Sequence, residues 1–203
     1  ASDPHMHAGE GDASVRDRMI TLAGEGIELP VATDHNAHTD YRPIAEKMGL
    51  LRYFTPIIGN EVTTRVGHFC VFPVEPGASV PDAEADEWRV LFDGIFRTPG
   101  VKVATLNHPR DKHGITRPLG PEHFNAAVGE TISGWPMGFN AMEVLNSGAT
   151  KTDILQYFRD WMAMLNRGRM VTPVGSSDSH DVARFFVGQA RTYVRCDDRD
   201  PGS

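Results

Sequence analysis

The sequence is poor in cysteine and has no excess of positive charge. Its 2 cysteines, Cys70 and Cys196, are too few for a disulfide framework or a thiolate zinc site. Cys70 lies within an apolar run at residues 69–72, and we interpret it as a small buried side chain. Lysine and arginine total 20 against 27 aspartates and glutamates, so the formal net charge is −7. We therefore expect no nucleic-acid partner, because such surfaces gather basic residues.

Long apolar runs are also missing. No stretch is long enough to cross a bilayer, and no basic segment followed by an apolar one resembles a secretion signal. We expect no membrane partner, and localisation stays open. The 203 residues, of which 40% are hydrophobic, fit one domain over residues 1–203. Because candidate ligands begin almost at residue 1, we expect this domain to be excised from a longer protein.

The chain instead shows an alternation of helical and extended patterns. We predict helices over residues 15–23, 41–49, 86–96 and 152–166. We predict strands over residues 27–33, 55–59 (leading to Glu61), 68–72, 101–106, 139–145, 170–174 and 192–194. This alternation indicates an α/β fold with a mainly parallel sheet or barrel.

Polar side chains follow five of these predicted strands, namely His35, Glu61, His108, Asn146 and Asp178. In a β/α barrel the loops after the strands converge on one face, which carries the catalytic residues. These side chains are therefore expected to meet although they lie far apart in the sequence.

Two pairs of candidate ligands have i, i+2 spacing, which places both side chains on one face of an extended segment. The first is His5 and His7, with Asp12 close enough downstream to swing back as a further ligand. The second is Asp178 and His180, among small residues that allow close approach. Their ordinary alternatives are a frayed terminus for the first pair and a helix cap for the second.

The strand-end residues in the first half have local alternatives too. Asp34, beside His35, is equally suited to a turn, and Glu61 to a cap. Thr63 and Thr64 are candidate hydrogen-bond donors around Glu61.

The histidines that follow are His68, which opens a predicted strand, and His108, whose direction Pro109 restricts. Arg110 and Arg65 are candidate anion clamps, with ordinary surface arginines as the alternative. Taken together, carboxylates and imidazoles with almost no thiolate indicate a hydrolytic metal centre, and they are too many for one ion. The remaining histidines are expected to be bystanders: His38, His113 and His123.

The order of these motifs resembles the polymerase and histidinol phosphatase (PHP) superfamily of metal-dependent hydrolases. The matching elements are Asp-x-His-x-His at residues 3–7, Thr-Asp-His-Asn at 33–36, Gly-x-Glu at 59–61, His68, His108-Pro109 and Ser-Asp-x-His at 177–180. The segment 59–69 resembles the carbaryl-hydrolase-related branch. The resemblance implies a distorted (β/α) barrel, which we expect to be truncated at the C-terminus because the last predicted strand ends at residue 194.

The resemblance also implies up to three divalent ions, which ligand type leaves open between zinc, manganese and iron. By position, the first ion would be held by His5, His7, Glu61 and Asp178. Glu61 would bridge to a second ion, completed by His68 and His108. The third would be held by Asp12, His35 and His180, with Glu10 as the substitute for Asp12.

The leading hypothesis is hydrolysis of a small anionic phosphoester by a hydroxide that bridges two ions. Arg110 or Arg65 would hold nonbridging oxygens, and His180 or His35, if free of metal, would protonate the leaving group. A carbamate or carboxylic ester on the same site is the second hypothesis, with Trp135, Met137 and Phe139 around an apolar pocket. The third is a metal-binding regulatory module without turnover. An amidohydrolase is disfavoured, since Glu61 stands where that fold needs a bridging lysine.

Overall fold

The structure is a computed structural model that describes residues 1–112, 117–132, 134–148 and 153–197. The helices are α1 (Val15–Gly24), α2 (Arg42–Lys47), α3 (Trp88–Arg97) and α4 (Ile154–Asn166). The strands are β1 (Ser2–Asp3), β2 (Leu29–Ala32), β3 (Ile57–Ile58), β4 (Asn60–Thr64), β5 (Gly67–Phe72), β6 (Val103–Leu106), β7 (Phe124–Asn125), β8 (Glu130–Thr131), β9 (Ala141–Asn146) and β10 (Thr172–Ser176).

All four predicted helices are present, and side-chain caps start two of them. Ser14 accepts a hydrogen bond from the backbone N–H of Asp17 and starts α1, and Asp153 accepts from Leu155 and starts α4. The predicted start of α4 at Thr152 lies outside the described residues. Among the described helices, none combines the length and apolar character that a membrane crossing requires.

The strands form a mixed rather than mainly parallel arrangement. Sheet order is β1-β2-β3 in one sheet and β10-β9-β6-β5-β4 in a second, with β7-β8 as a separate pair. The prediction of parallel pairing is correct for β1-β2-β3 and for β6-β9-β10, but wrong for β5, which runs antiparallel to β4 and β6. Only two residues, Arg65 and Val66, separate β4 from β5, and so short a link can join only antiparallel strands.

The expected closed barrel is not formed by the described strands. The two larger sheets are instead joined by isolated bridges, with Met6 beside Ser179 and His35 beside Glu61. The predicted last strand at 192–194 is reduced to one bridge, between Thr192 and Ser2. Ladder pairing is thus reduced to single bridges beside His5, His7, His35 and Asp178, whereas Glu61 and His68 lie within the continuous β4-β5 ladder.

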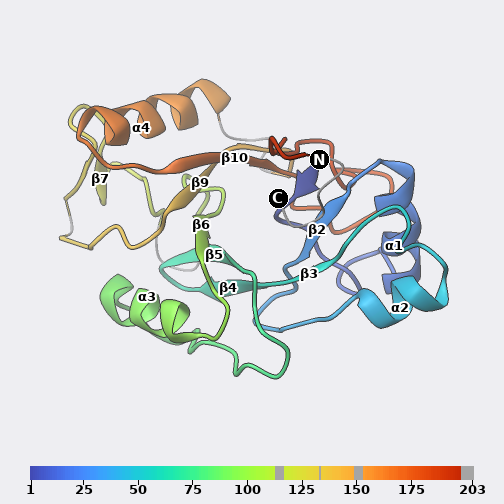
Figure 1. Cartoon of the computed structure of the whole chain (residues 1–203). Coiled ribbons are helices and arrows are strands. Elements are labelled where there is room, and N and C mark those ends of the chain that lie inside the picture. The colour runs from blue at the N-terminus through green and yellow to red at the C-terminus, as the bar shows by residue number, and fades with distance from the viewer. Residues whose placement is uncertain (113–116, 133, 149–152, 198–203) are drawn as a thin grey trace.

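Two hydrophobic layers enclose the space between the sheets. On one side, α3 and α4 cover the five-stranded sheet, with Trp88, Phe69 and Met164 in a single apolar cluster (Figure 1). On the other, α1 and α2 pack against the three-stranded sheet around Met19 and Ala45. Because side chains alternate along a strand, Val62 joins the first cluster while Glu61 points the opposite way, into the interior.

Candidate metal centre

The side chains of His5 and His7 enter the interior from the segment after β1. Both are buried, and Met6 between them packs into the apolar cluster beneath α1 and α2. The backbone of His7 donates to Ser179, which brings this segment beside the one that carries Asp178 and His180. The predicted alternation therefore holds here, with the two imidazoles on one face and a core methionine on the other.

Three residues at strand ends adopt left-handed backbone conformations. Asn36 has φ 49°, His108 has φ 22° and Asp178 has φ 52°. Asparagine, aspartate and histidine tolerate this region better than most residues, but it is still uncommon. Asn36 directly follows the candidate ligand His35, and His108 and Asp178 are candidate ligands themselves. Such backbone strain is concentrated at functional sites.

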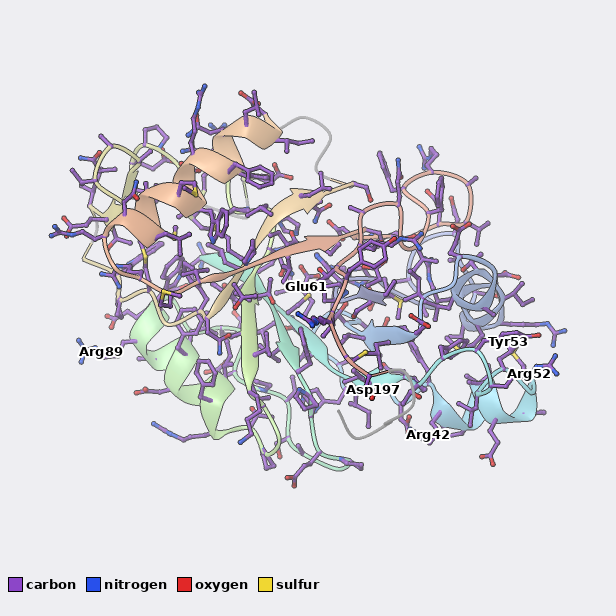
Figure 2. The ribbon with its side chains drawn as sticks, turned by 45° about the horizontal axis from the view of Figure 1, so that its top comes forward. Arg42, Arg52, Tyr53, Glu61, Arg89 and Asp197 are labelled. Carbon is purple, nitrogen blue, oxygen red and sulfur yellow. The ribbon has the colours of Figure 1, made fainter. Side chains whose placement is uncertain are left out.

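Glu61 lies at the centre of the candidate ligands. It stands within β4 rather than after a strand as predicted. Figure 2 shows it in the interior, whereas the labelled arginines point outward at the periphery. Its Oε1 is 3.1 Å from Nδ1 of His68 and 3.6 Å from Nε2 of His108. Its Oε2 is 2.9 Å from Nε2 of His35 and 3.6 Å from Nε2 of His7. The two oxygens thus face different histidines, which is the arrangement of a bridging carboxylate.

The structure brings eight of the nine predicted metal ligands into one cluster, which also includes Glu10. Among described residues, the groups able to hold an ion are His5-His7-Glu61, His5-His108-Asp178, Glu61-His68-His108 and His7-Glu10-His35-His180. Glu61 is shared by two of these groups. Burial decreases from Glu61, 1% exposed, to the side chains of His35 and His180, 36% and 39% exposed. Glu10, His35 and His180 of the fourth group therefore form the rim, whereas His7 of the same group is buried.

The donor atoms fit divalent ions. Among the described residues, Nε2 of His5, both ring nitrogens of His7 and Oε2 of Glu61 are buried without a hydrogen bond. Nε2 of His5 is 3.2 Å from Oδ1 of Asp178 and 3.4 Å from Oε1 of Glu61. Ligands about 2.0–2.1 Å from a tetrahedral ion stand about 3.3 Å apart. Buried polar atoms without a hydrogen-bond partner cost free energy, so these atoms and their spacing indicate a site for a divalent ion.

Electrostatic attraction between carboxylates and imidazoles holds the side chains of the cluster together. Burial opposes charge on Glu61, but the neighbouring histidines, His5 above all, hold its pKa well below the usual range. The carboxylate of Glu61, whose Oε2 lies 2.9 Å from Nε2 of His35, raises the pKa of His35 to about 9, against the effect of burial. Protons on these imidazoles therefore balance the carboxylates, and ions that bind must displace them.

Asp12 is the one predicted ligand that the structure does not bring in. It is exposed, and its backbone N–H donates to the carbonyl of His180. Glu10 takes its place, with Oε2 2.6 Å from Nδ1 of His35 and 3.2 Å from Nδ1 of His7. Although burial opposes it, the neighbouring imidazoles of His7 and His35 lower the pKa of Glu10 to about 2. The turn over residues 9–12 decides between the two carboxylates.

Arg110, predicted to clamp an anion, is instead committed to α4. Its Nε and Nη2 donate to the carboxylate of buried Asp160 at 2.6 and 2.8 Å. Gln156 donates to the same carboxylate. Through Nε and Nη2, Arg110 ties the segment after His108 to the helix.

Asp160→Asn is therefore expected to destabilise the fold by about 2 kcal/mol, the typical worth of a charged hydrogen bond. Urea unfolding measures the loss. Asp153→Asn, which keeps a capping oxygen on the same helix, is the control and is expected to change little. Equal stability of Asp160→Asn and the unaltered chain would contradict this role.

Glu143 is a site residue that the sequence interpretation missed. It is fully buried in β9, and Nδ1 of His5 donates to its Oε1 at 2.7 Å. The sequence signal that could have identified it is a single carboxylate within the apolar run 141–145. This run directly precedes Asn146. Arg18 of α1 was also missed, although it is fully buried and donates to the carbonyls of His7 and Ser179.

Other predicted residues lie in supporting or unrelated positions. Nδ2 of Asn107 donates to Oε1 of Glu61 at 3.0 Å and to Sγ of buried Cys70, so Asn107 takes the part expected of Thr63 and Thr64. Thr63 and Thr64 donate to backbone carbonyls instead. Of the expected bystanders, His38 contacts the carbonyl of Ala78, His123 stacks on Trp135, and His113 lies outside the described residues.

Comparisons with known proteins show likeness in fold alone. No protein-family profile matches the chain, and no curated protein matches its sequence. The chain is similar to the crystal structure of PsfC from Pseudomonas syringae, with a TM-score of 0.56 and 15% identity over 91% of this chain and 76% of that one. It is also similar to a candidate metal-dependent phosphoesterase from Bifidobacterium adolescentis, with a TM-score of 0.54 and 12% identity over 94% and 92%.

Proposed function

We propose that this chain is a metal-dependent hydrolase that cleaves a small phosphoester. The observation that carries the proposal is the convergence of buried, unpartnered imidazole and carboxylate atoms around Glu61. The fold likeness to a candidate metal-dependent phosphoesterase supports the reaction class. We further propose membership of the PHP superfamily, with the carbaryl-hydrolase-related branch as the narrower assignment. The bridges that join the two sheets support a distorted barrel.

The proposed ligand assignment follows the groups around Glu61. His5, His7, Glu61 and Asp178 would hold one ion. Glu61, His68 and His108 would hold a second, and the rim residues Glu10, His35 and His180 a third. Divalent ions in such a site, here zinc, manganese or iron, lower the pKa of bound water toward about 7 and offset charge on phosphoryl oxygens.

The chain's own residues would then orient the substrate and supply a proton. The rim is the most exposed part of the cluster, so a substrate enters past His35 and His180. Either imidazole, when it does not hold an ion, gives a proton to the departing alkoxide as the phosphorus–oxygen bond breaks. Arg110 is held by Asp160, so the ions rather than this guanidinium would bind the substrate anion.

The carbamate or carboxylic ester alternative has less support from side-chain placement. Of the residues expected around an apolar pocket, Phe139 belongs to the apolar cluster beneath α3, and Trp135 and Met137 pack against it. The ring centroid of Trp135 is 5.1 Å from that of Trp88. These residues serve the core, and the alternative becomes an outcome of the assay below.

The proposal is tested by metal analysis of protein purified without chelators or affinity metal, followed by parallel assays. We expect more than one divalent ion per chain and metal-dependent turnover of p-nitrophenyl phosphate. Turnover of naphthyl carbamates alone would replace the substrate class. Full metal loading without hydrolysis of any ester would favour a regulatory module, and a chain that binds no divalent ion would overturn the proposal.

A further inference from the structure

Glu143 lies beneath the cluster and is surrounded by hydrogen-bond donors from four different segments. Its Oε1 accepts from Nδ1 of His5 and from the hydroxyl of Ser176. Its Oε2 accepts from the backbone N–H of His108 at 2.5 Å and from Nδ2 of Asn146 at 2.8 Å. The side chain is 0% exposed, so no solvent shares these bonds.

Each of these partners can only donate in this arrangement. A carboxylate accepts and does not donate, so the proton of His5 must lie on Nδ1. With that proton in place, Nε2 is the nitrogen left to bind an ion, and it is the buried, unbonded nitrogen that stands 3.2 Å from Asp178 and 3.4 Å from Glu61. Glu143 thereby directs the ligating nitrogen of His5 toward Glu61 and Asp178.

The same carboxylate holds the strained backbone of His108. At φ 22° this residue lies where few non-glycine residues are found, and its N–H is bonded to Oε2 of Glu143. The left-handed turn directs Nε2 of His108 to within 3.6 Å of both Glu61 and Asp178. One buried carboxylate thus sets the direction of two imidazoles that the proposed assignment gives to two different ions.

We propose that Glu143 is the positioning residue of the metal centre, which orients His5 through Nδ1 and His108 through its backbone N–H. This inference rests on the proposed function in that it requires ions at the cluster. Outer carboxylates that orient ligating histidines typically change metal affinity by about 10–100-fold.

Two variants test whether the position or only the charge of the Glu143 carboxylate matters. Glu143→Gln keeps the shape but directs an NH2 group at donors, so at least one of the bonds is lost. Glu143→Asp keeps the charge but shortens the reach by one methylene. Glu130→Gln removes a surface carboxylate that pairs with Arg167, and serves as the matched control.

Zinc affinity, measured by chelator competition, is expected to fall about 10–100-fold in both Glu143 variants and to stay unchanged in Glu130→Gln. If Glu143→Asp binds zinc as the unaltered chain does, charge alone matters and the positioning role is wrong. Circular dichroism of the metal-free variants checks that each is folded.

Nitrogen-15 NMR of the zinc-loaded, unaltered chain tests the inference without any variant at position 143. We expect His5, assigned through the loss of its signals in His5→Gln, to carry a slowly exchanging proton on Nδ1. A proton on Nε2 instead would overturn the inference even if every variant failed to fold. A chain that binds no zinc at all would count against the proposed function itself, so the two failures are distinguishable.

Discussion

Glu61→Gln is expected to lower metal-supported hydrolysis by at least about 100-fold, since even outer partners of a metal site are worth 10–100-fold. The carboxylate lies within 3.6 Å of ring nitrogens on five histidines: His5, His7, His35, His68 and His108. An amide of the same shape lacks the charge and offers one acceptor oxygen in place of two. The amide cannot offer an oxygen ligand toward both sets of histidines, so the chain should also bind fewer ions.

The measurements are the metal content per chain and the rate with p-nitrophenyl phosphate at saturating metal. Glu46→Gln, an exposed carboxylate on α2, is the matched control and should leave both unchanged. Metal-free unfolding of the two variants separates loss of ligation from loss of fold. Intact metal content and turnover in Glu61→Gln, joined by intact turnover in His108→Ala, would sink the bridging scheme.

Arg18→Met is expected to destabilise the metal-free chain by about 3 kcal/mol, the cost of losing charged hydrogen bonds in the interior. Arg18 is fully buried on α1, where Nε donates to the carbonyl of His7 at 2.8 Å and Nη2 to that of Ser179 at 3.0 Å. Methionine has similar bulk but removes the Arg18 donor from the carbonyl of His7, and leaves that of Ser179 with the backbone N–H of His7. Backbone bonds alone then hold the segments that carry His7 and Asp178 side by side, so zinc affinity should fall as well.

Arg16, two residues earlier on the same helix, is exposed and provides the control. Arg16→Met should change the free energy of unfolding by no more than about 0.5 kcal/mol. Arg18→Lys keeps the charge but not the planar fork, and should lie between the two. Urea unfolding monitored by circular dichroism gives all three values, and equal stability of Arg18→Met and Arg16→Met would refute the clamp.

The helices, most strands and the types of metal-binding side chain could be predicted from the sequence because their signals are local. Capping by Ser14 and Asp153, apolar periodicity, and the i, i+2 spacing of His5 with His7 each involve neighbouring residues. The convergence of strand-end residues followed from fold class alone. The antiparallel direction of β5 was missed because the predicted strands end at residue 59 and resume at 68, so β4 and its two-residue link to β5 were not predicted.

Only the tertiary structure decided which partner each polar group takes. The turn over residues 9–12 selects Glu10 over Asp12, and Arg110 binds Asp160, which lies 50 residues away. Glu143 meets His5 across 138 residues, and Arg18 reaches Ser179 across 161. The sequence by itself determined a chain rich in imidazole and carboxylate at the ends of its strands. Which of them would meet depended on how two sheets and two hydrophobic layers pack, and no local pattern carries that information.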